Sequence, residues 1–187
     1  MRDKTRRQRY DEKKPIAKTY PISIATVNFM HDGNLGYIVR SAACFGAECV
    51  HVIGSVPDRS VLNPLSGSLS DYVVIKQHNT PLEFLNYTRR ENLQVVSAEL
   101  APHAVPIEKY QFNFDNPVCI VVGHEETGIP TEIIRDSDAV YIPMPGVGYC
   151  LNTAQTGNIL LYEAVKKYEA KLRYMQQWVE ARDIHLP

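Results

Sequence analysis

Short apolar runs alternate with segments of helical periodicity along most of the chain. Residues 21–29 form a β-branched run typical of a strand, and apolar side chains then recur at helical spacing from about Asn34 until Gly46. A last, long helix is predicted from Leu151 toward Trp178. Further strands are expected at 48–54, 71–76, 93–100, 116–123 and 139–144, and further helices at 80–92 and 129–137. This alternation predicts an α/β domain with a mostly parallel sheet and helices on both faces.

Local signals support two of these segments and predict one loop. Thr80, Pro81 and Glu83 form a capping-box pattern at the start of a helix. The run at 116–123 is continuously apolar, as expected of a strand that is buried on both faces. Residues 57–70 are rich in Pro, Asn, Ser and Gly, so we expect a loop there.

Charge divides the chain into two parts. Residues 1–20 carry eight Lys/Arg against three Asp/Glu, a net charge of +5, whereas the remainder carries twelve against eighteen, a net charge of −6. The length of 187 residues suits one compact domain, which we place at 21–187, preceded by a flexible basic arm at 1–20. Such an arm either binds phosphates or is simply a solvated terminus.

The composition also bears on the compartment. No apolar run approaches the roughly eighteen residues of a membrane span, and the basic N-terminus lacks the apolar stretch of a secretory signal. The four cysteines form no C-x-x-C pair, so we expect reduced thiols in a cytoplasmic protein and no zinc site. His124 has no second histidine at a helical offset, and we predict no metal.

Three glycine-containing loops leave the carboxyl ends of predicted strands, at 28–40, 121–130 and 143–152. Ligands of parallel α/β sheets bind at this edge. Singly, each loop also describes an ordinary connection, and the first lacks the Gly-x-Gly-x-x-Gly spacing of a dinucleotide-binding turn.

Taken together, the three loops closely resemble the SpoU (TrmH-like) family of RNA ribose 2′-O-methyltransferases, part of the SPOUT class. Asn34, five residues, Arg40 and then "SAACFG" match its first motif. "CIVVGHEETGIP" matches the second, an apolar strand followed by Gly-x-Glu-x-x-Gly, and "YIPMPGVGYCLN" matches the third. The resemblance covers about residues 22–165.

The resemblance implies a SPOUT-type fold with a deep C-terminal trefoil knot, a homodimer, and methyl transfer from S-adenosylmethionine to a ribose 2′-hydroxyl of RNA. Transfer RNA is the expected substrate, because the compact plan resembles the members that modify it; ribosomal RNA is the alternative. The positions implied in catalysis are Arg40, Asn34, Glu125 and Asn152. Those implied in cofactor binding are Val122, Gly123, His124, Gly128, Ile142, Met144, Gly146, Cys150 and Leu151.

An arginine stays protonated in proteins, with a pKa of about 12.5 or more. We therefore expect Arg40 to orient the ribose and stabilise the emerging alkoxide rather than to remove the proton. The chain departs from the family pattern at Cys150, where serine is usual, and in the polar "TAQTGN" that follows. These departures leave open a catalytically silent homologue that binds S-adenosylmethionine or RNA.

Overall fold

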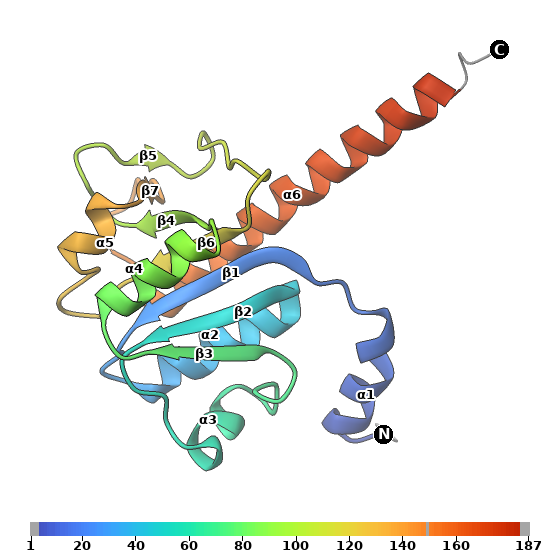
Figure 1. The fold of residues 1–187 in the computed structure, drawn as a ribbon. Coiled ribbons are helices and arrows are strands. Elements are labelled where there is room, and N and C mark those ends of the chain that lie inside the picture. The colour runs from blue at the N-terminus through green and yellow to red at the C-terminus, as the bar shows by residue number, and fades with distance from the viewer. Residues whose placement is uncertain (1–3, 149, 184–187) are drawn as a thin grey trace.

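A parallel sheet forms the centre of the protein, as seen in a computed structural model that describes residues 4–148 and 150–183 (Figure 1). Within these residues the sheet has seven strands in the order β3-β2-β1-β6-β4-β7-β5, and every neighbouring pair is parallel. The strands are β1 (Tyr20–Val27), β2 (Ala47–Ile53), β3 (Val74–His78), β4 (Gln94–Ala98), β5 (Val105–Pro106), β6 (Val118–Val122) and β7 (Asp138–Tyr141).

Helices cover both faces of the sheet, which confirms the predicted α/β class. They are α1 (Arg6–Lys13), α2 (Asp32–Phe45), α3 (Arg59–Leu65), α4 (Pro81–Arg90), α5 (Thr131–Arg135) and α6 (Thr153–Asp183), and a 3₁₀ turn, η1 (Lys14–Ile16), follows α1. Helices α2 and α6 pack on one face of the central strands, and α4 and α5 pack on the other. None of the described helices is long and apolar enough to cross a bilayer. The trefoil knot stays a prediction of the resemblance.

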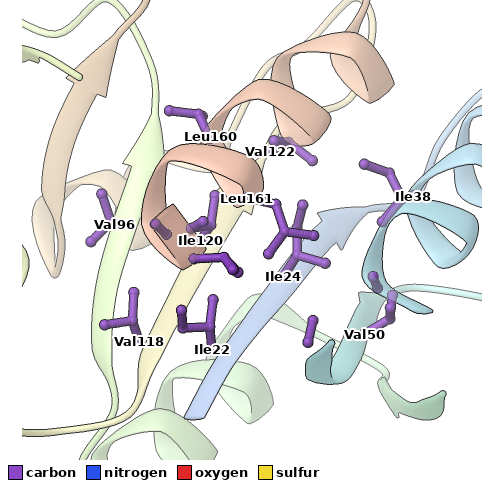
Figure 2. Packing of buried hydrophobic residues seen from close by; sticks show 14 of the residues in the cluster. Ile22, Ile24, Ile38, Val50, Val96, Val118, Ile120, Val122, Leu160 and Leu161 are labelled. Atoms are coloured by element: carbon purple, nitrogen blue, oxygen red, sulfur yellow. The ribbon is translucent and has the colours of Figure 1, made fainter. Parts of the chain in front are cut away.

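The residues of strand β6 are all apolar because both faces of the strand are buried. Val118, Ile120 and Val122 point toward the α2–α6 face, where Figure 2 shows them with Leu160 and Leu161 of α6. The intervening Cys119 and Val121 belong to the cluster beneath α4 and α5. Since successive side chains of a strand point to opposite faces, a strand with helices on both sides can be apolar at every position.

Glycine and threonine set two helix boundaries where the sequence predicts them. Helix α2 ends at Gly46, whose φ of +71° suits glycine; a Cβ there would lie 2.3 Å from the Lys18 carbonyl oxygen. The Thr80 hydroxyl accepts a hydrogen bond from Glu83 N at 3.1 Å and caps α4. The Glu83 carboxylate accepts from Asn79 N, one residue before the expected partner of a capping box.

Two segments differ from expectation. The loop expected at 57–70 is wrong for Arg59–Leu65, because these residues form α3. Tertiary packing overrides the weak helical propensity of this stretch: Leu62 is buried, and the Leu65 side chain packs so closely on Gly36 of α2 that a Cβ there would lie 2.4 Å from it. Helix α1 lies within the basic arm and has no apolar periodicity that could have predicted it.

Candidate functional site

The three glycine-containing loops meet at one edge of the sheet. They follow β1, β6 and β7 and lead into α2, α5 and α6, respectively. Strands β1 and β6 are neighbours, and only β4 separates β6 from β7. Parallel strands bring their carboxyl ends to the same edge, so segments about 90 residues apart in the sequence come into contact there.

Glu125 is the polar centre of this edge. Its carboxylate accepts hydrogen bonds from the Asn34 side-chain amide and, at 2.9 Å, from Met30 N. Burial alone would raise the pKa of Glu125, but hydrogen bonds from backbone N–H groups at Met30, Glu125 and His31 and from Asn34 outweigh it and hold the pKa below its usual range. The carboxylate is therefore ionised and fixed in place at neutral pH.

Asn34 and Asn152 extend this network into the last helix. Asn152 Nδ2 donates to Asn34 Oδ1 at 3.1 Å, so the amide of Asn34 bridges Glu125 and Asn152. Asn152 Oδ1 accepts from Ala154 N at 2.9 Å and from Gln155 N at 3.3 Å, the geometry of an N-cap of α6. One chain of side-chain hydrogen bonds thus joins all three loops.

The loop after β6 is held in a tight turn. His124 and Gly128 exchange backbone hydrogen bonds of 3.0 Å, and His124 Nδ1 accepts from Glu126 N at 3.1 Å and from Thr127 N at 3.3 Å. The neighbouring Gly123 has no room for a side chain, since a Cβ would lie 2.5 Å from the Gly128 carbonyl carbon. Its own carbonyl oxygen accepts a hydrogen bond of 2.8 Å from Thr153, which ties the turn to the start of α6.

A cavity of about 490 Å³ lies between the loops after β4, β6 and β7. Among the residues predicted to bind a cofactor, it is lined by Val122, Gly123, His124, Gly128, Ile142, Met144, Cys150 and Leu151. Gly146 does not line it and is exposed, and a Cβ added there would have no described neighbour within 4 Å. Glu99 also lines the cavity and was missed; its position just beyond the end of β4 is the signal that could have found it.

Arg40 lies in a second concavity, of about 810 Å³, formed by α2 and the start of α6. This groove shares Leu151 and Asn152 with the first cavity, and Asn34 also lines it. Arg40 is exposed, and its guanidinium makes no hydrogen bond or ion pair with the part of the chain that the structure describes. It is not joined to Glu125, which bonds Asn34 and Met30 instead.

The structure brings three of the four predicted catalytic side chains into contact but not the fourth. Asn34, Glu125 and Asn152 contact one another directly, whereas Arg40 stands six residues after Asn34 on α2. Chemically, the edge offers an open, partly apolar cavity beside a groove that contains the Arg40 guanidinium. Among the described residues, no group of three or more His, Cys, Asp or Glu side chains is arranged to hold a metal ion.

Comparison with known families gives one match that covers most of the chain. Residues 21–162 match the model of the SpoU rRNA Methylase family. The tRNA (guanosine(18)-2′-O)-methyltransferase of Escherichia coli K12 is 25% identical over 145 residues, which are 77% of this chain but 62% of that protein. The 23S rRNA (uridine(2479)-2′-O)-methyltransferase of Streptomyces viridochromogenes is 29% identical over 143 residues, 72% of this chain and 49% of that one.

Solved structures give the same picture. An AdoMet-bound rRNA methyltransferase from Sinorhizobium meliloti superimposes with a TM-score of 0.72 at 26% identity, covering 79% of this chain and 58% of that one. A TrmH/SpoU tRNA modifying enzyme from A. aeolicus gives a TM-score of 0.73 over 90% of this chain and 87% of that one, and its 22% identity supports the fold alone. The chain thus spans about six tenths of the length of several proteins that it resembles.

Proposed function

The chain belongs to the SpoU rRNA Methylase family, and from its site we propose that it transfers a methyl group from S-adenosylmethionine to a ribose 2′-hydroxyl of RNA. The observation that carries this proposal is the hydrogen-bond chain from Glu125 through Asn34 to Asn152. This chain of hydrogen bonds fixes the residues between the first cavity and the groove of Arg40. Transfer between two bound substrates requires that donor and acceptor be held close together in a fixed orientation, and the two concavities meet at Leu151 and Asn152.

The first cavity fits S-adenosylmethionine in size and lining. Its volume of about 490 Å³ lies within the usual range for small-molecule sites, about 300–1,000 Å³. Val122, Ile142 and Leu151 would pack against the adenine. The backbone of the Gly123–Gly128 turn would approach the adenine closely, because only glycine fits at position 123. When bound, this cofactor supplies the electrophilic methyl group.

Arg40 supplies the charge that the acceptor needs. A ribose hydroxyl becomes a good nucleophile only as it loses its proton, and a guanidinium cannot accept that proton because it is already protonated. We infer that Arg40 orients the ribose and its phosphate and stabilises the developing alkoxide. Glu125 accepts hydrogen bonds from Asn34 and Met30 N, so it acts as a positioning residue for Asn34 and the loop after β1.

Transfer RNA is the substrate that we propose, on the basis of the similarity to the E. coli tRNA methyltransferase, of which the chain covers 62%. We also propose a homodimer that uses the outer face of α6, where Tyr162 is 51% exposed. Light scattering should give twice the chain mass, and Tyr162→Arg should reduce the measured mass.

A cytoplasmic location agrees with four cysteines that form no disulfide.

The decisive comparison is between Arg40→Ala and Arg135→Ala, which removes an exposed arginine that lines neither concavity. With labelled S-adenosylmethionine and total RNA, Arg40→Ala should bind the cofactor normally and lose about 10²–10³ in rate, the usual effect of removing one donor to a developing oxyanion. Arg135→Ala should match the wild type. Full turnover by Arg40→Ala would refute the assignment, and cofactor binding without any product by the wild type would favour the silent homologue.

A further inference from the structure

A third cavity, of about 500 Å³, also has Arg40 in its wall. Part of its wall comes from the basic segment before β1, including Tyr10, Lys13, Lys14 and Lys18. Arg40 therefore borders both the groove beside Asn34 and a cavity to which the N-terminal segment contributes. The basic segment is not remote from the site but forms part of its surroundings.

Helix α1 (dark blue in Figure 1) is anchored by specific contacts rather than by charge. The Tyr10 hydroxyl donates to the Gly67 carbonyl oxygen at 3.2 Å, and its ring packs edge-on against Tyr72 with centroids 5.5 Å apart. The Tyr72 hydroxyl donates in turn to Asp11 Oδ1 at 2.7 Å. Gly67 is also the neighbour of Arg40, since a Cβ there would lie 3.6 Å from Arg40 Nη1. The helix and Arg40 thus meet at the same turn.

The cations of this region differ from those of the last helix. On α6, Lys166 pairs with Glu163 at 2.9 Å and Lys171 pairs with Asp115 at 2.8 Å. Lys13 and Lys14, by contrast, are exposed and form no ion pair with any residue that the structure describes.

Lys18 is the remaining lysine around the cavity, and it too lacks a close ion pair. Lys18 has a loose contact of 3.6 Å with Glu169, and its side chain is 74% exposed. Glu169 is the sole carboxylate in the described lining, and it already accepts a hydrogen bond from the Tyr20 hydroxyl. The cavity therefore carries four cations, three of them with no carboxylate partner in the described residues.

We propose that Lys13, Lys14, Lys18 and Arg40, hereafter the basic cleft, bind the phosphodiester backbone of the RNA next to the nucleotide that is methylated. The proposal rests on the proposed function, which puts the acceptor ribose beside Arg40. Cations gathered in a concavity attract a polyanion, and contacts to phosphates set its register without reading its sequence. Because α1 is docked at Gly67, these contacts lie at a fixed position relative to Arg40.

The test is the salt dependence of binding to unfractionated transfer RNA. Each phosphate contact contributes about 0.7 (single strand) to 0.9 (duplex) to the slope of log K against log salt. The triple variant K13Q/K14Q/K18Q should therefore have a slope that is shallower by about 2.1 to 2.7. Between 50 and 200 mM salt, the affinity of the wild type should fall about 20- to 40-fold more than that of the variant.

The triple variant K109Q/K166Q/K171Q is the matched control, because it removes the same charge from lysines outside the cleft, of which Lys109 and Lys166 are exposed and Lys171 is half-buried. It should keep the wild-type slope. In methyl-transfer assays the cleft variant should raise the KM for RNA and leave kcat and cofactor affinity near wild type. Equal slopes for the two triple variants, or a changed cofactor affinity, would overturn the proposal. Wild-type protein that binds the RNA in the cleft but never methylates it would instead refute the proposed function.

Discussion

Asn152 has two separable roles, and substituting it in two ways should divide them. Its Oδ1 caps α6 through Ala154 N and Gln155 N, while its Nδ2 donates to Asn34. Asn152→Ala removes both. An N-cap is worth about 1 kcal/mol and a hydrogen bond about 1 kcal/mol, so the loss should be about 2 kcal/mol. For a chain of this size, that lowers the Tm by about 4–8 °C.

Asn152→Asp should separate the two roles, because aspartate caps helices about as well as asparagine. The variant should therefore stay within about 1 kcal/mol of the wild type. It cannot donate to Asn34, however, and it places a second carboxylate beside that amide. Asn34 donates to Glu125 through the same amide group. If the Asn34 amide turned to donate to the new carboxylate, its oxygen would face the Glu125 carboxylate. The hydrogen bonds that fix the residues between the two concavities should then be broken.

Thermal unfolding followed by circular dichroism and methyl transfer to RNA are the two readouts. Both variants should lose most transfer, but only Asn152→Ala should lose the stability of the cap. An Asn152→Asp variant with wild-type turnover would show that the network is dispensable. Equal destabilisation by the two substitutions would show that Oδ1 does not act as a cap.

Three further perturbations test other parts of the account. Burial lowers the pKa of His51 to about 3 in the folded protein, so the unfolded chain takes up a proton at a higher pH. The contribution of His51 to the free energy of unfolding is complete above about pH 6.5 and should fall by about 2 kcal/mol by pH 5. His51→Gln should flatten this loss, as measured by urea unfolding. Gly123→Ala, with no space beside Gly128, should abolish cofactor binding in calorimetry. Lys167→Met, which removes hydrogen bonds of 2.7 Å to two backbone carbonyls, should cost about 2 kcal/mol by the same urea assay.

The sheet could be predicted from the sequence because the apolar positions of its strands are the positions that are buried in the structure. Strand β6 is apolar at every position, and Gly46 marks the end of α2 by its conformation. Helix α3 could not be predicted in this way, because it contains Pro64 and depends on the packing of Leu65 against Gly36. Helix α1 has no buried residue, so no hydrophobic pattern marks it.

The site could be predicted only as far as the loops. The rule that ligands bind at the carboxyl ends of strands brings Asn34, Glu125 and Asn152 to one edge. Which amide bonds which carboxylate depends on distances between loops, and no sequence pattern records them. The same limit explains why Gly146 was expected in the cofactor cavity but lies outside it, whereas Glu99 lines it.

Nucleoside analysis of the methylated RNA distinguishes methylation of the ribose from methylation of the base. RNA incubated with the protein and labelled S-adenosylmethionine is digested to nucleosides, and mass spectrometry locates the added methyl group on the sugar or on the base. We predict a 2′-O-methylnucleoside that is formed by the wild type and is nearly absent with Arg40→Ala. A methyl group on a base, or equal product from both proteins, would contradict it.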